Sequence, residues 1–167
     1  MNHPVKWLIV ITIISFQGGG IASGKDIAAH KNRLAASQLE GTWIAIWKAK
    51  SGMPRIHNEI RMLALDKHQL KAEFYGAYNY IDPSGAQALN VGVAIGAASI
   101  DDGVVSFDPI RATDVWGCKI TMTKRGLELV VTQQQECGFG SHVYADGTYR
   151  RKSRKKPMFT ETFWNDQ

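Results

Sequence analysis

Residues 116–133, WGCKITMTKRGLELVVTQ, decide the fold of this chain. As far as Lys124, apolar residues alternate with Lys and Thr, and the alternation resumes from Leu127. A period of two is typical of strands that bury one face. Between the halves, Gly126 permits the positive φ that a tight turn needs. The stretch therefore predicts an antiparallel hairpin.

Six further segments are rich in β-forming residues and are separated mostly by short turns: residues 42–48, 59–65, 69–78, 90–100, 104–107 and 142–151. About eight short antiparallel strands in sequence order favour an all-β fold, a small closed barrel without exposed edges. A two-sheet sandwich is the alternative. Residues 26–40 contain good helix formers and predict a short N-terminal helix or an arm before the first strand.

The N-terminus has the pattern of a cleavable signal peptide. Lys6 precedes the mainly apolar run WLIVITIISF, residues 7–16, which is followed by small residues up to Ala22. This run is about half of the ~20 residues that a membrane-spanning helix needs. We therefore expect a signal peptide at 1–22, an arm or short helix at 23–40, a β domain at 41–151 and a basic, flexible tail at 152–167.

Export to the periplasm or beyond the cell permits disulfide bonds. The chain has two cysteines, Cys118 and Cys137, so only one pairing is available. Two buried free thiols are the alternative. A redox-active pair would more often be C-x-x-C, which is absent from the sequence. We expect a structural disulfide.

The net charge of +5 comes from the C-terminal region. Six basic residues fall between positions 150 and 156, whereas basic and acidic residues are equal in number between 23 and 149. A basic pI of this origin gives no reason to expect a nucleic-acid partner. The tail is interpreted either as a solvated extension or as an attachment to an anionic envelope surface.

Sequence motifs for catalysis and metal binding are missing. The five histidines have no metal-ligand spacing, and neither a nucleophile elbow nor a phosphate-binding glycine loop occurs. We therefore expect a protein that is not an enzyme and that needs neither a metal nor a cofactor.

Gly41-Thr42-Trp43, at the start of the first predicted strand, resembles the G-x-W signature of calycins, the barrel superfamily that includes lipocalins and avidins. The resemblance implies that Trp43 packs across one end of the barrel beneath a basic residue of the last strand. Arg150 and Arg151 are the candidates for that contact.

A second resemblance covers about the last third of the β domain. The pattern Cys118…Cys137-Gly-Phe-Gly-x-x-Val-x-Ala-Asp-Gly-Thr-Tyr149 is similar to the ending of small exported bacterial proteins of uncharacterised function. Some of these are loosely associated with lysozyme-inhibitor families. The resemblance implies a compartment and a fold, and it supplies no catalytic residue.

Two functional hypotheses follow. The first is a binding module, for example an inhibitor of a cell-wall-active or other secreted enzyme, that presents Phe139 and His142 on a loop braced by the disulfide. The second is a calycin-like carrier of a small apolar ligand. Tyr75, Tyr78 and Tyr80 are a candidate aromatic patch, on which a protein partner or a sugar could stack. Ordinary core and rim packing is the alternative for these tyrosines.

Overall fold

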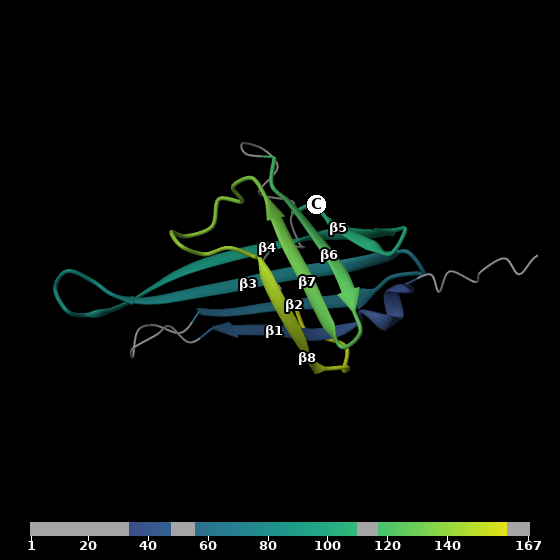
Figure 1. Cartoon of the computed structure of the whole chain (residues 1–167), viewed down its shortest axis with the longest axis horizontal. Helices are drawn as coiled ribbons and strands as arrows, with labels where there is room; N and C mark the ends of the chain where they lie inside the picture. Colours follow the sequence, from purple (N-terminus) through teal and green to yellow (C-terminus); the bar gives the residue numbers. More distant parts are fainter. Residues whose placement is uncertain (1–33, 48–55, 110–116, 160–167) are drawn as a thin grey trace, which may run out of the picture. The chain divides into compact units, whose positions relative to one another are not determined.

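The computed structural model describes residues 34–47, 56–109 and 117–159. Within these ranges lie a short 3-10 turn, η1 (Ala36–Gln38), and eight strands: β1 (Gly41–Trp47), β2 (Ile56–Ala64), β3 (Gln69–Ile81), β4 (Gln87–Asp101), β5 (Val104–Phe107), β6 (Lys119–Arg125), β7 (Glu128–Gln134) and β8 (Gly147–Ser153). The strands run in sequence order around a closed antiparallel barrel, in which β8 pairs with β1 (Figure 1). The predicted barrel is confirmed, and the sandwich is excluded.

One face of each strand fills the barrel. In the β6–β7 hairpin, Ile120, Met122 and Leu129 are fully buried, whereas Lys119 on the opposite face is exposed. The alternation in residues 116–133 thus describes an inner and an outer face, as expected for a strand with a two-residue period. Figure 1 shows this hairpin crossing in front of β2, β3 and β4.

One end of the barrel is closed by η1 and the residue that follows it. Ala36 and Leu39 are fully buried. The Ala36 N–H donates to the carbonyl of Lys67 in the β2–β3 turn at 3.1 Å. Indole Nε1 of Trp43 donates to the Leu39 carbonyl at 2.8 Å. These bonds hold residues 34–40 on the barrel, where the helical part of the predicted arm or short helix is the three-residue turn η1. Residues 23–33 lie outside the described part of the chain.

The β3–β4 hairpin is longer than the sequence predicted. Its strands reach Ile81 and resume at Gln87, although pairing between β2 and β3 ends at Tyr78. The turn is held by the Asp82 carboxylate, which accepts from the backbone N–H of Ser84 at 2.8 Å and that of Ala86 at 2.9 Å. Figure 1 shows the hairpin extending past its neighbours.

The last strand differs from the prediction at both ends. His142 has a φ of +65°, so the chain bends there, and β8 begins at Gly147 rather than at 142. It continues to Ser153, beyond the predicted domain boundary at 151. Farther on, Phe159 lies beneath the ammonium group of Lys71, 4.4 Å from Nζ to the ring centroid. Phe159, within the predicted tail, thus contacts Lys71 of β3.

The disulfide joins Cys118, directly before β6, to Cys137 in the loop after β7, and both residues are buried. It confirms the predicted pairing and indicates an oxidising compartment. The predicted signal peptide, residues 1–22, and residues 160–167 of the predicted tail lie outside the described ranges. Where the structure is described, no helix has the length and apolar character to cross a membrane.

Candidate functional site: a basic groove beside the closed end of the barrel

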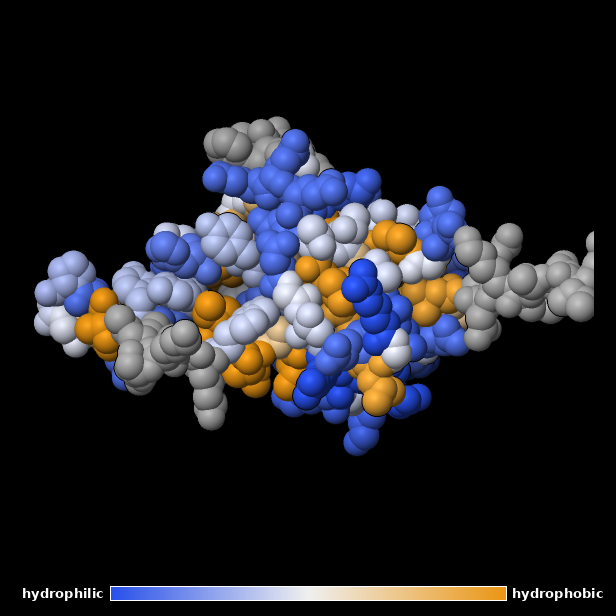
Figure 2. Space-filling view, in the orientation of Figure 1, coloured by the Kyte–Doolittle hydropathy of each residue, from blue (hydrophilic) through white to orange (hydrophobic). Residues whose placement is uncertain are grey.

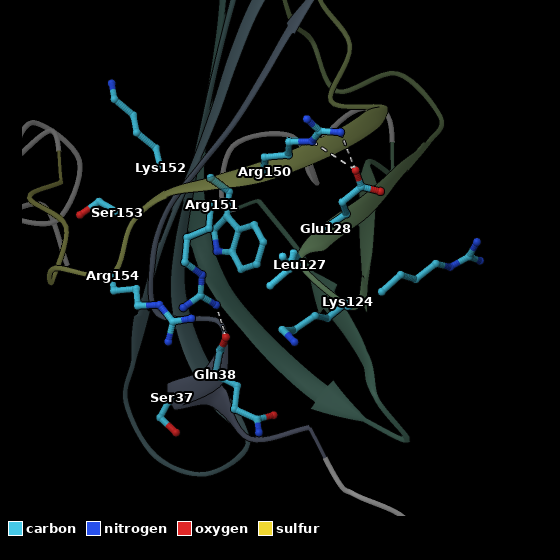
Figure 3. A pocket seen from close by; sticks show the side chains of 13 residues that line it. Ser37, Gln38, Lys124, Leu127, Glu128, Arg150, Arg151, Lys152, Ser153 and Arg154 are labelled. Carbon is cyan, nitrogen blue, oxygen red and sulfur yellow. Dashed lines mark hydrogen bonds and ion pairs between the residues drawn. The ribbon is translucent and has the colours of Figure 1, made fainter.

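A groove of about 1080 Å3 lies between η1, the β6–β7 turn and β8 (Figure 3). Among the described residues, Glu128 is the one carboxylate that lines it. Its basic side chains are Lys124, Arg125, Arg150, Arg151, Lys152 and Arg154. A concave surface with such an excess of positive charge attracts anions and raises their local concentration.

The strand register brings these basic residues together. Arg125 lies opposite Glu128 across the β6–β7 hairpin, and Glu128 lies opposite Arg150 across the β7–β8 pair. Gly126 has a φ of +59° at the first central position of the two-residue turn, where glycine is favoured. This turn places the cations of the β6–β7 hairpin beside those of β8.

Arg151 has a structural role in the groove. Its guanidinium lies over the ring of Trp43, 4.4 Å from the centroid, and donates to the carbonyl of Gln38. Burial, together with the neighbouring charge of Arg154, lowers the pKa of Arg151 from its ordinary value. Figure 3 shows the side chains of Arg151 and Arg154 both directed toward η1. An anion placed between them would relieve their mutual repulsion.

Arg150, the other residue considered for the contact with Trp43, turns away from it. Its guanidinium pairs instead with the Glu128 carboxylate at 3.1 Å (Figure 3). The side chains of Arg150 and Glu128 are 82% and 40% exposed, so this ion pair contributes little to stability. Glu128 therefore offsets Arg150 alone among the groove cations that the structure describes, and the groove keeps its positive character.

The loop predicted to present Phe139 to a partner packs on its own barrel. The Phe139 ring is half-buried, with its centroid 4.9 Å from that of Phe74. The Gly140 N–H donates to the carbonyl of Val91 in β4 at 3.2 Å. A Cβ added at Gly92 would lie 2.7 Å from Phe139 Cβ. Phe139 thus anchors the loop on the barrel, and its predicted contact with a partner stays a prediction.

A substitution at Gly92 tests this docking. We expect Gly92→Val to lower the free energy of unfolding by about 1–3 kcal/mol, because the added side chain collides with Phe139. In Gly92→Val/Phe139→Ala the loss should be less than the sum of the two single losses, because two of the three close contacts, those to the ring atoms Cγ and Cδ1, are gone. Urea denaturation of the parent protein, the two single variants and the double variant measures these losses. Strict additivity would contradict the contact.

The three candidate tyrosines do not form one cluster. Tyr75 lies opposite Glu59 and Val93 on the outer face of the sheet. Tyr78 and Tyr80 are on the other face, where their rings stack with centroids 6.0 Å apart. His142 is exposed and lies against Tyr78, with ring centroids 5.1 Å apart. The strand alternation therefore separates Tyr75 from Tyr78 and Tyr80, and the loop after β7 brings His142 against Tyr78.

The groove offers charge and hydrogen-bond donors. Each arginine presents a planar fork of N–H donors that matches carboxylate and phosphate oxygens. Within the described ranges, no group of three or more His, Cys, Asp or Glu side chains is arranged to hold a metal ion. What the arrangement can do chemically is bind anions.

The sequence reasoning missed four groove residues, Lys124, Arg125, Lys152 and Arg154, as parts of one site. It counted the first two in a neutral domain and the last two in a tail. The predicted order of the strands contained the missing signal, because antiparallel pairing of consecutive strands places Glu128, at the start of β7, opposite Arg150 in β8.

Comparisons with known protein families, with curated proteins and with solved structures found no match. The two resemblances noted in the sequence therefore stay predictions.

Proposed function

We propose that this protein is an exported, non-catalytic binding module whose basic groove binds an anionic partner in the periplasm or outside the cell. The observation that carries the proposal is the lining of the groove, to which the described part of the chain contributes six basic side chains and one carboxylate. The disulfide and the signal-peptide pattern support the compartment.

Several separate cations suit a partner with several negative charges. Lys124 comes from the β6–β7 hairpin and Arg154 from the segment after β8, so they approach a ligand from two directions. A hydrogen bond to a charged group contributes about 1.5–3 kcal/mol. Because charges near the surface are screened by salt, we expect binding that weakens as ionic strength rises.

Two features of the barrel favour this groove over the other hypotheses. An inhibitor that inserts the Cys137 loop would need Phe139 free, whereas this ring is anchored against Phe74. A carrier would need an interior cavity of roughly 300 Å3 or more. The interior instead holds large, fully buried side chains, among them Trp43, Phe74, Phe107 and Tyr149.

Charge-removing variants test the proposal. We expect Lys124→Gln/Arg154→Gln to bind heparin, as a model polyanion, at least about tenfold more weakly at fixed salt. The matched control is Lys67→Gln/Lys119→Gln, which removes two exposed lysines that do not line the groove. Titration by fluorescence or calorimetry measures both affinities. Equal weakening in the two double variants would show that only net charge matters and would contradict a groove site.

A further inference from the structure

Leu127, at the tip of the β6–β7 turn, is unusually exposed for its type. Its exposed fraction is 83%, and among the described large apolar residues only Met158 is more exposed. Gly126 takes the left-handed conformation of the two-residue turn, so Leu127 is held outward at the second central position. The strands on both sides of the turn are paired up to Arg125 and Glu128. The leucine is therefore held at a fixed point of the surface.

The surroundings of Leu127 are basic. It lines the same groove as Lys124, Arg125, Lys152 and Arg154. Two further exposed lysines, Lys155 and Lys156, follow along the chain. In Figure 2 the lower edge, where Figure 1 places the β6–β7 turn and the end of β8, is deeply hydrophilic beside an apolar patch.

From this arrangement we infer that the groove end of the barrel docks on an anionic lipid surface, with Leu127 inserted among the headgroups. The inference rests on the proposed function, because it names the anionic partner of the groove. Lipid phosphates meet the cations, and the leucine enters the apolar boundary beneath them. Interfacial segments combine these two contributions, and basic residues near a negatively charged leaflet each strengthen attachment.

Charge also sets the orientation of docking. The β2–β3 turn lies beside the end of β4 that leads into the β4–β5 turn, since the Ile100 N–H donates to the carbonyl of His68. These turns carry the exposed carboxylates Asp66, Asp101 and Asp102. An anionic surface repels that side and attracts the β6–β8 side. A soluble polyanion would need only the cations, so the exposed leucine among them favours a lipid surface.

Vesicle binding tests the role of the leucine. The protein is titrated with vesicles of phosphatidylglycerol and phosphatidylcholine, and with phosphatidylcholine alone. We expect binding to the anionic vesicles only, and about tenfold weaker binding for Leu127→Ser. Leu65→Ser is the matched control, because Leu65 is 59% exposed on the β2–β3 turn and does not line the groove. Its affinity should stay within about twofold of the parent protein.

A second measurement locates the leucine directly. In Leu127→Trp the added fluorescence should shift to the blue on anionic vesicles and be quenched by brominated lipids, whereas that of Leu65→Trp should not. Equal behaviour of the two positions in both experiments would overturn the inference. Binding to heparin without binding to vesicles would also overturn it and leave the proposed function intact. Binding to neither would contradict both.

Discussion

Replacing Trp43 with alanine is expected to lower the free energy of unfolding by about 3–5 kcal/mol. Its side chain is 1% exposed and is among the largest that are fully buried in the described core. The replacement also removes the hydrogen bond from Nε1 to the Leu39 carbonyl and the ring on which the Arg151 guanidinium lies. The closed end of the barrel would thus lose packing and two fixed contacts together.

Trp47→Ala is the matched control, since Trp47 is 36% exposed and lies in the same strand. We expect Trp47→Ala to lower the free energy of unfolding by less than half as much as Trp43→Ala. Trp43→Phe keeps a ring beneath Arg151 and loses the donor, so a cost of about 1–3 kcal/mol is expected from the unpaired carbonyl and the smaller ring. Urea denaturation followed by far-ultraviolet circular dichroism compares the three. Similar losses at Trp43 and Trp47 would contradict the role assigned to Trp43.

The strands were predictable because their signals are local. Alternation along 116–133 determines which face of β6 and β7 is inside, and Asp-Gly or Asp-rich turns separate the elements. The end of β3 was harder to predict, because Asn79–Leu89 contains a strong turn cluster whose side-chain hydrogen bonds tighten the turn to residues 82–86. The start of β8 was missed because His142 adopts a left-handed φ that its residue type does not require.

The site was predictable only in part, because it depends on register. The sequence identified Arg150 and Arg151 as candidates beside Trp43, but their opposite orientations follow from strand pairing. Trp43 lies opposite Arg151 on the inner face, whereas Arg150 lies opposite Glu128 on the outer face. The bulge between Thr42 and Trp43 shifts that register by one residue. A shift of one residue exchanges the two faces of a strand, and it cannot be read from composition.

Loss of the disulfide is the other change with a large expected effect. We expect Cys118→Ala/Cys137→Ala to be about 3 kcal/mol less stable, on the loop-entropy account for a separation of 19 residues. Alanine is preferred to serine because both sites are buried, and a hydroxyl there would lack a partner. Denaturation with and without a reducing agent measures the effect. The parent protein should fall to the stability of the variant when reduced, and the variant should not respond.

The same variant separates the bridge from the docking of its loop. Phe139 and the hydrogen bond from the Gly140 N–H to Val91 remain available without the sulfurs. If the disulfide acts mainly on the unfolded chain, native-state hydrogen exchange at Gly140 should speed up only as much as global stability falls. If the disulfide instead holds the loop in place, the exchange rate at Gly140 should rise by more than the fall in global stability explains. Core amides such as that of Ile120 should follow global unfolding in either case. Because Phe139 is anchored independently, we expect the first result.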